Sequence, residues 1–266
     1  MLPLTKLRHI SQQKDLLKQL VLREVRGRYA GSSIGFYWSV INPLIMLAVY
    51  TYVFSAILKI RMGDEPGITD YGLYLFCGFL PWNAFQETVQ RSTTVILDNA
   101  TLIKNLSFPS KVLPLSIGLN AIIHQVIGIG ILIIVVAILL GFFPIHLWAA
   151  IPLMIFQLMF SLGLGFLLCT LHVYIRDTSQ FVAVFLLIWM FGTPLFYPEK
   201  MVPAGFRFLV DYNPMAYVVR MFREIFLKNT LPSLYDGAVF GAVAVAFLLI
   251  GYAVYTKNFY HFVDQL

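Results

Sequence analysis

Charged residues are scarce in this chain, and their scarcity excludes most soluble folds. Lys, Arg, Asp and Glu make up 12% of the 266 residues, and apolar residues make up 59%. A soluble domain usually has about 25% charged and about 45–50% apolar residues. So few charges cannot cover a surface that faces water, which predicts an integral membrane protein. The net charge of +6 then indicates contact with anionic lipid, and not with nucleic acid.

Cysteine is nearly absent, and the motifs of nucleotide chemistry are missing. The two cysteines, Cys77 and Cys169, lie in apolar stretches and support neither a disulfide framework nor a metal site. No Gly-Lys dipeptide occurs, so the chain has no phosphate-binding loop of the Gly-x-x-x-x-Gly-Lys type. No nucleophile constellation stands out either. We therefore expect a protein that is not an enzyme and binds no cofactor, and any ATPase that drives it must be another chain.

Long apolar runs predict an all-α polytopic membrane protein, because about 20 apolar residues suffice for one crossing. Four runs are long enough, and two shorter ones carry Pro, Gly or polar residues. The six predicted transmembrane helices, all within a domain of residues 35–256, are residues 35–60, 71–95, 112–140, 148–172, 181–197 and 237–256. Residues 1–34 are rich in Lys and Arg, which predicts a cytosolic N-terminus. With six spans, residues 257–266 form a cytosolic tail. Counting basic residues does not separate this topology from one in which residues 71–85 fail to cross.

Two segments on the expected cytosolic side have amphipathic patterns. In residues 13–28, apolar residues recur at three and four positions among basic ones, which is typical of a helix lying in the membrane interface. A helix packed on a partner protein is the alternative. In residues 93–111, Asp98 is expected to cap a short helix that runs through Ile103 and stops before Pro109. The alternative for this segment is an ordinary connector.

Residues 198–236 separate the fifth and sixth predicted spans and have an unusual sequence pattern. Pro203 and Pro214 break the segment into short apolar pieces, one of which, residues 216–227, has a helical pattern. Short re-entrant helices would explain this, because irregular backbone at membrane depth must be enclosed by protein or line a wet cavity. A pair of helices lying on the membrane surface is the alternative.

Aromatic residues are abundant, at 15% of the chain. Flat rings with polar rims suit the apolar faces of sugars, so aromatics of the first and fifth spans are candidates for lining a conduit. Packing or lipid contact is the alternative. In the fifth span the candidates recur at intervals of four, four and seven, which places them on one helical face. The channel-lining candidates are Tyr37, Trp38, Tyr50, Tyr52, Phe54, Phe181, Phe185, Trp189 and Phe196.

Ionisable groups within the predicted spans are few, chiefly Glu87 and His124. An ion-coupled transporter usually needs several intramembrane carboxylates or their partners, so the sequence argues against that class, which stays the main alternative. A membrane-embedded transferase for lipid-linked sugars would need a cluster of His or carboxylates, which cannot be assembled from the scattered residues. Basic residues at the inner leaflet, Arg23, Arg26 and Arg28, are candidates for binding a pyrophosphate through charge-assisted hydrogen bonds. Lipid headgroups are their alternative ligand.

Several motifs along residues 20–256 together resemble one family. They are residues 22–29 and 35–44, Gly78-Phe79-Leu80-Pro81-Trp82, Tyr174-Ile175-Arg176-Asp177 and Tyr212-Asn213-Pro214-Met215. In this order they resemble the membrane subunit of type 2 ABC exporters, in the branch that exports lipid-linked O-antigen, capsule and teichoic-acid polymers.

The resemblance implies a permease of the bacterial inner membrane with six spans and both termini in the cytoplasm. Its expected partners are a second copy of itself and two copies of an ATPase subunit that binds ATP and Mg²⁺. The cargo would be a polysaccharide linked to polyprenyl pyrophosphate, O-antigen first and capsule or teichoic acid next, passing between two protomers. Residues 198–227 would be re-entrant external helices. Residues 93–107 would dock on the ATPase as a coupling helix, through Ile96, Asp98, Asn99, Thr101, Leu102 and Lys104.

Overall fold

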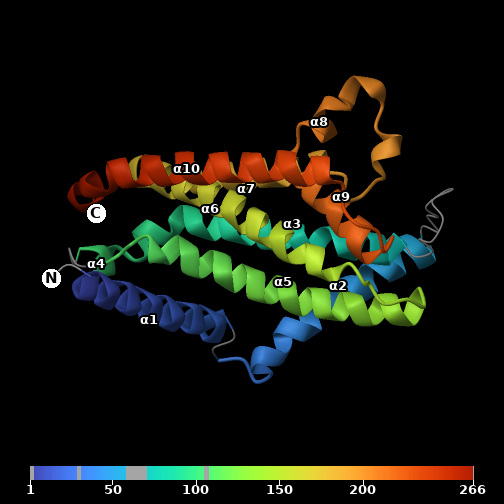
Figure 1. The fold of residues 1–266 in the computed structure, drawn as a ribbon, viewed down its shortest axis with the longest axis horizontal. Helices are drawn as coiled ribbons and strands as arrows, with labels where there is room; N and C mark the ends of the chain where they lie inside the picture. Colours follow the sequence, from blue (N-terminus) through green and yellow to red (C-terminus); the bar gives the residue numbers. More distant parts are fainter. Residues whose placement is uncertain (1–2, 29–30, 58–70, 105–107, 266) are drawn as a thin grey trace.

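The chain forms a bundle of long helices that run along one axis (Figure 1). The computed structural model describes all residues except 1–2, 29–30, 58–70, 105–107 and 266, so parts of the predicted first span, the coupling segment and the tail lie outside it. The described residues contain helices and loops and no strand. The axial helices are α2 (Trp38–Tyr50) with its π-helical extension Thr51–Ile57, α3 (Tyr71–Asp98), α5 (Val112–Leu139), α6 (Ala150–Tyr174), α7 (Thr178–Gly192) and α10 (Leu234–Gln265).

An all-helical architecture is confirmed, and four described segments are long and apolar enough to cross a membrane. They are Gly35–Val53, Val112–Leu139, Leu147–Tyr174 and Leu234–Phe259. The helices α3 and α7 lie at the two weaker predicted spans, and they do not meet the same criterion of length and apolar character.

The central helix is α3, and its position among other helices explains why its sequence is less apolar than that of the four long spans. It packs against α2, α5, α6, α7 and α9 (Pro214–Phe226), and nearly all its residues from Tyr71 to Phe85 are buried. A helix enclosed by other helices needs no apolar face toward lipid, so it can carry polar residues such as Glu87 and Arg91. With a rise of 1.5 Å per residue, its 28 residues extend for about 42 Å, more than the roughly 30 Å of a hydrocarbon core.

The helix α7 is shorter than the predicted span 181–197. It ends at Gly192, and Thr193 is extended with φ −92° and ψ 138°. Pro194 follows, and a residue before proline is driven out of the helical region. Residues 193–197 therefore form a connector that leaves the helix axis.

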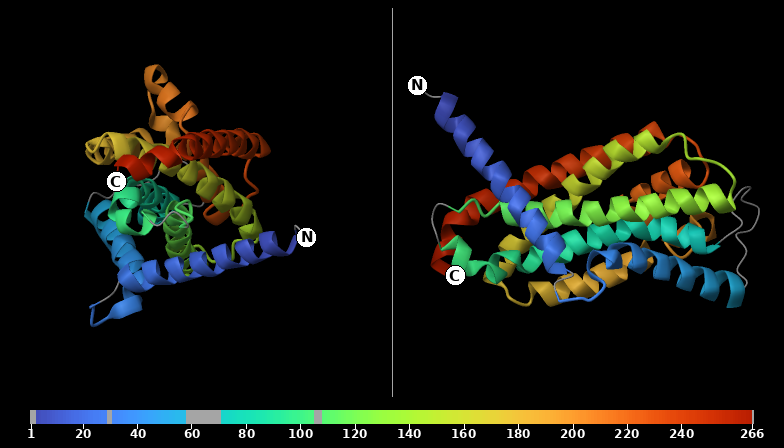
Figure 2. Two further views of the ribbon diagram at one scale, coloured as in Figure 1. Left: turned by 90° about the vertical axis from the view of Figure 1, so that its left-hand side faces the viewer. Right: turned by 90° about the horizontal axis from the view of Figure 1, so that it is seen from below.

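Three elements gather at one end of the bundle, called here the α4 end: α1 (Pro3–Arg28), α4 (Ala100–Ile103) and the end of α10 (Figure 1). The predicted helix at residues 13–28 is confirmed, and α1 crosses the bundle obliquely (Figure 2). It packs on α5, and Leu20 is buried in a cluster with Ile96 and Tyr255. Part of its apolar stripe thus covers the chain's own bundle.

The short helix through Ile103 is confirmed, but Asp98 does not cap it. The preceding helix α3 continues through Asp98, and Asn99 occupies the N-cap position of α4. The Asp98 carboxylate instead accepts a hydrogen bond from the Thr94 hydroxyl at 2.6 Å.

The opposite end, called here the α9 end, carries the broken segment after α7. The turns Glu199–Met201 and Ala204–Phe206 and the helix α8 (Phe208–Asp211) project from the bundle (Figure 1). The helix α9 instead returns into the bundle, where Val219 and Phe222 are fully buried. Its start is fixed by Asn213, whose side-chain oxygen accepts the Met215 N–H at 3.0 Å, as an N-cap residue does.

Candidate functional site

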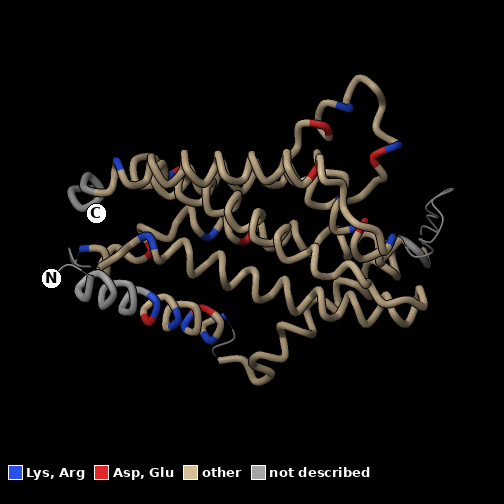
Figure 3. The backbone as a smooth tube through the Cα atoms, in the orientation of Figure 1, with Lys and Arg blue, Asp and Glu red and all other residues tan. Residues whose placement is uncertain are grey.

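A polar cavity of about 670 Å³ lies between the C-terminal part of α1 and the middle of α3, and it is called here the α1–α3 cavity. In both helices the lining positions recur at intervals of one, three or four, so each set lies on one face. Charged residues among the described ones gather on α1, with few along the middle of the bundle (Figure 3). The cavity is lined by Arg23, Glu24, Gly27 and Arg28 of α1 and by Asn83, Gln86, Glu87, Gln90 and Arg91 of α3.

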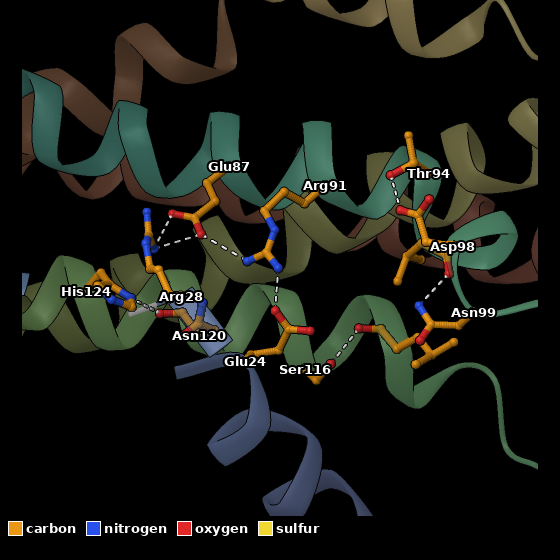
Figure 4. A network of polar contacts seen from close by, with 12 residues as sticks. Glu24, Arg28, Glu87, Arg91, Thr94, Asp98, Asn99, Ser116, Asn120 and His124 are labelled. Atoms are coloured by element: carbon orange, nitrogen blue, oxygen red, sulfur yellow. Dashed lines mark hydrogen bonds and ion pairs between the residues drawn. The ribbon is translucent and has the colours of Figure 1, made fainter. Parts of the chain in front are cut away.

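Two arginines and two glutamates join α1 to α3 across this cavity (Figure 4). The Arg28 Nη1 donates to both carboxylate oxygens of Glu87, at 2.9 and 3.0 Å. The Arg91 Nη1 donates to Glu87 at 3.3 Å, and its Nη2 donates to Glu24. The charges of the four groups cancel. Their side chains are 18–41% exposed, so water screens the interaction.

The three arginines of α1 that are predicted to bind a pyrophosphate do not all face the cavity. Arg23 and Arg28 line the cavity and Arg26 does not. At about 100° per residue, residue 26 is rotated by about 130° from the middle of the face that the four lining positions of α1 form. Arg23 has no ion-pair partner within the described part of the chain.

A second cavity of about 130 Å³ lies beyond the Arg28–Glu87 pair, between α2, α3 and α5. It shares Arg28, Asn83 and Glu87 with the α1–α3 cavity, so the ion pair stands between the two spaces. His124 lines it, and its Nδ1 lies 2.8 Å from the Asn120 carbonyl oxygen. Because a carbonyl only accepts, this ring nitrogen donates. His124 thus makes a polar contact within α5.

Three of the predicted aromatics line one apolar groove of about 440 Å³ along α7. Phe181 and Phe185 are 73% and 58% exposed. Trp189 is half-buried, because its ring packs on Trp82, Phe85 and Phe160. Its Nε1 donates to the Asn213 side-chain oxygen at 2.8 Å, so Trp189 also ties α7 to the start of α9.

The prediction that Phe196 shares this helical face is wrong. Phe196 lies beyond the end of α7, in the connector. Its ring stacks on Phe191 and meets the edge of Phe79, each at 5.3 Å between centroids. The interval of seven between Trp189 and Phe196 does not place the two side chains on one face, because the helix ends at Gly192.

The aromatics of the first predicted span have different surroundings. Tyr37 and Tyr52 are exposed, and Tyr50 stacks on Phe79 at 5.0 Å. The Trp38 Nε1 donates to the Ser32 hydroxyl at 3.1 Å. The side chain of Phe54 lies outside the described residues. Both α2 and α7 pack on α3 and lie on the same side of the bundle (Figure 2).

The predicted ATPase contacts fall at the α4 end, but not all are accessible. Ile96 is fully buried in the core, so it cannot dock on another chain. The Asn99 amide donates to the Val95 carbonyl at 2.9 Å. Asp98, Thr101 and Lys104 are exposed and Leu102 is half-buried.

A buried polar cluster around one arginine, at the α9 end, was not predicted from the sequence. Arg223 is 5% exposed and donates to Tyr74 Oη at 2.6 Å and to the Pro194 and Leu195 carbonyls at 2.7 and 3.0 Å. Its guanidinium carbon lies 3.4 Å from the Tyr74 ring centroid. The signal that could have revealed this cluster is an arginine on the apolar face of residues 216–227.

A second arginine of α9 is paired with acids. Arg220 binds Glu199 and Asp236, each at 2.8 Å. Burial opposes its charge, but the two carboxylates outweigh burial and hold the pKa of Arg220 above its usual value. This pairing ties the turn after α7, α9 and α10 together.

Metal ligands do not cluster in the structure as far as it is described: no three His, Cys, Asp or Glu residues gather there. Cys77 and Cys169 are buried free thiols.

Long apolar helices around a polar-lined cavity, with aromatics on one side, define a polytopic helical membrane protein. The ABC-2 type transporter family model matches residues 15–227, and the chain belongs to this family. Similar proteins include the O-antigen export system permease RfbA of Klebsiella pneumoniae, with 29% identity over 95% of both chains. RfbA of Myxococcus xanthus is 28% identical over 97% of this chain and 98% of its own. The polysialic acid transport protein KpsM of Escherichia coli is 22% identical over 91% and 93%.

Proposed function

We propose that this chain is the membrane subunit of an ATP-driven exporter of polysaccharide linked to polyprenyl pyrophosphate. The observation that carries the proposal is the similarity to O-antigen export permeases over nearly the full length of both chains. Relatives named for polysialic acid and capsule export are less similar, at 20–24% identity. O-antigen is therefore the favoured cargo, and capsule or teichoic acid comes next.

We propose a topology of six membrane-crossing helices: α2 with its extension, α3, α5, α6, α7 and α10. The α4 end faces the cytoplasm of the bacterial inner membrane, because the Lys- and Arg-rich α1 lies there. Both termini are then cytoplasmic. The helix α9 enters the outer leaflet as a re-entrant element, enclosed by the bundle as such backbone requires.

Two copies of the chain form the export channel in this proposal. The face of α7 supports it, because six apolar side chains there are more than half exposed: Phe181, Val184, Phe185, Leu187, Ile188 and Phe191. Together with the exposed rings of α2 on the same side, they give a wall on which sugar rings slide with weak, repeated contact.

A separate ATPase subunit supplies the energy and binds ATP and Mg²⁺. Exposed residues near α4, Asp98, Thr101 and Lys104, are the proposed contacts. Because α3 runs unbroken from the α9 end to this point, movement of the ATPase would be transmitted along the central helix. The pyrophosphate of the cargo would meet Arg23, the lining arginine that no carboxylate of the described residues neutralises.

Removal of exposed rings on α7 tests the channel. Phe181→Ala with Phe185→Ala should lower surface polysaccharide several-fold at unchanged protein level, because both rings are more than half exposed. Trp189 is less suitable, since its ring is part of the aromatic core. Tyr235→Ala removes a ring that is 72% exposed at the start of α10 and serves as the control.

Unchanged export by the double variant contradicts an aromatic-lined channel. The alternative of an ion-coupled transporter makes a different prediction: export would persist without the ATPase subunit and follow the ion gradient.

A further inference from the structure

We infer that the α1–α3 cavity is a sugar-binding site that recognises the first sugar attached to the lipid diphosphate. The inference rests on the proposed function and extends it from transport along the channel to selection before transport. A volume of about 670 Å³ lies within the range of about 300–1,000 Å³ that is typical of small-molecule sites.

The lining chemistry is that of a hydroxyl-rich ligand. Asn83, Gln86 and Gln90 line the cavity from one face of α3, and each amide offers both donors and an acceptor. Sugar hydroxyls also donate and accept, so they pair with such groups. A site for a bare anion would present donors, yet this cavity also contains the carboxylates of Glu24 and Glu87.

Part of this amide set is held in position. The Trp82 Nε1 donates to the Gln86 side-chain oxygen at 2.8 Å, which fixes the amide plane and leaves its NH₂ group for a ligand. The side chain of Gln90 is exposed and, within the described residues, has no hydrogen-bond partner. The fixed amide of Gln86 and the open amide of Gln90 both suit a binding site, because a group that is already in position loses little entropy when a ligand binds.

The one cation of the cavity lining that has no neutralising partner among the described residues indicates where the diphosphate would bind. Arg28 and Arg91 are neutralised by Glu24 and Glu87, which leaves Arg23 as the only unneutralised cation among the described lining residues. One free positive charge is weak capture for a bare diphosphate. The neutral amides therefore supply a large share of the binding, and the sugar becomes part of what is recognised.

Gly27 offers a way to fill the cavity without damaging the fold. A Cβ at this position would have nothing within 4 Å, and Gly27 lies within α1, where other residues favour helix more. Gly27→Leu should therefore project into the cavity and leave the protein folded. Gly130→Leu is the matched control, because Gly130 in α5 likewise has nothing within 4 Å and does not line this cavity.

Binding is measured on the purified chain with its ATPase subunit in lipid nanodiscs by native mass spectrometry. The probes are polyprenyl diphosphate carrying one N-acetylhexosamine, the same lipid without sugar, and phosphatidylglycerol. Wild type should prefer the sugar-bearing lipid at least tenfold over the bare diphosphate. Asn83→Ala with Gln90→Ala should abolish that preference and keep the affinity for the bare diphosphate. Gly27→Leu should lower binding of the sugar-bearing lipid at least tenfold, and Gly130→Leu should not.

Equal binding of the sugar-bearing and bare lipids by wild type overturns the inference, as does equal binding of phosphatidylglycerol. A sugar preference that survives in the Asn83/Gln90 double variant also overturns it. Deletion of the gene separates this failure from failure of the proposed function. Loss of surface polysaccharide on deletion keeps the export function even where the cavity shows no sugar preference, whereas persistence of surface polysaccharide rejects the export function itself.

Discussion

Arginines hold helices together in two regions of the bundle, the α1–α3 cavity and the α9 end, but by different means. At the α1–α3 cavity, Arg28 and Arg91 meet carboxylates and their side chains stay 37% and 41% exposed. At the α9 end, Arg223 is 5% exposed and, among the described residues, its hydrogen-bond acceptors are neutral oxygens, beside the ring of Tyr74. Exposed ion pairs contribute about 0–1 kcal/mol, so the first cluster can open and re-form, whereas the second is a fixed part of the fold.

The burial of Arg223 is compensated locally. Three hydrogen bonds and a cation–π contact replace its hydration, although its Nε has no hydrogen-bond partner among the described residues. Two of its acceptors are carbonyls of the connector after α7, which carries Phe196. Arg223 thus anchors this connector to α9.

The largest effect is expected from Arg223→Ala. It removes the guanidinium that donates to the buried Pro194 and Leu195 carbonyls, and each buried unsatisfied group costs about 1–3 kcal/mol. The thermal unfolding midpoint of the purified protein should fall by several degrees. Arg207→Ala, which removes an exposed arginine of the same segment, should leave it unchanged. Equal midpoints for the two variants would remove the distinction between the α9 end and the α1–α3 cavity.

A smaller loss is expected from Asp236→Asn. The carboxylate is 9% exposed and accepts from Arg220, and a hydrogen bond to a charged group contributes about 1.5–3 kcal/mol. Asn keeps an acceptor and Glu199 still pairs with Arg220, so the loss of unfolding free energy should be about 1 kcal/mol. Asp211→Asn changes a 53%-exposed acid in the same segment and should cost nothing measurable.

At the α1–α3 cavity, Glu87→Gln should change stability by less than about 1 kcal/mol, because the ion pairs there are screened by water. The difference from wild type should shrink further as salt is raised, since the Debye length falls from about 10 Å at 0.1 M to about 3 Å at 1 M. Unfolding midpoints at low and high salt measure this. A loss comparable to that of Arg223→Ala would show that the cavity cluster is as rigid as the α9 end.

The smallest effect is expected from Arg26→Ala, because Arg26 does not line the α1–α3 cavity. Surface polysaccharide should stay within twofold of wild type. Arg23→Ala, three residues earlier, should lower it several-fold. If the two variants behave alike, α1 contributes general attraction to anionic lipid and no specific contact.

Much of the fold follows from local patterns. The apolar runs predict the places of the axial helices, because each run forms its own backbone hydrogen bonds. The amphipathic pattern of residues 13–28 predicts α1, and Asn213-Pro214 marks the start of α9. The extent of α7 was overestimated, since the Gly192-Thr193-Pro194 break was treated as tolerable within a span.

The candidate site was predicted less well, because its partners are far apart in the sequence. The α7 pattern placed Phe181, Phe185 and Trp189 together and wrongly added Phe196. The burial of Ile96 depends on α1 and α10 packing over it, which no local pattern contains. The amide set of the α1–α3 cavity was missed because Asn83, Gln86 and Gln90 are ordinary polar residues until α1 encloses them.

The sequence by itself determined that this is a helical membrane protein and where its helices lie, because hydrophobicity and helical periodicity act over neighbouring residues. Only the tertiary structure decided how the charges are used. Arg28 and Glu87 are 59 positions apart, and Arg223 and Tyr74 are 149 apart. Whether an arginine is neutralised, screened or buried depends on which distant oxygen atoms the packed helices bring to it.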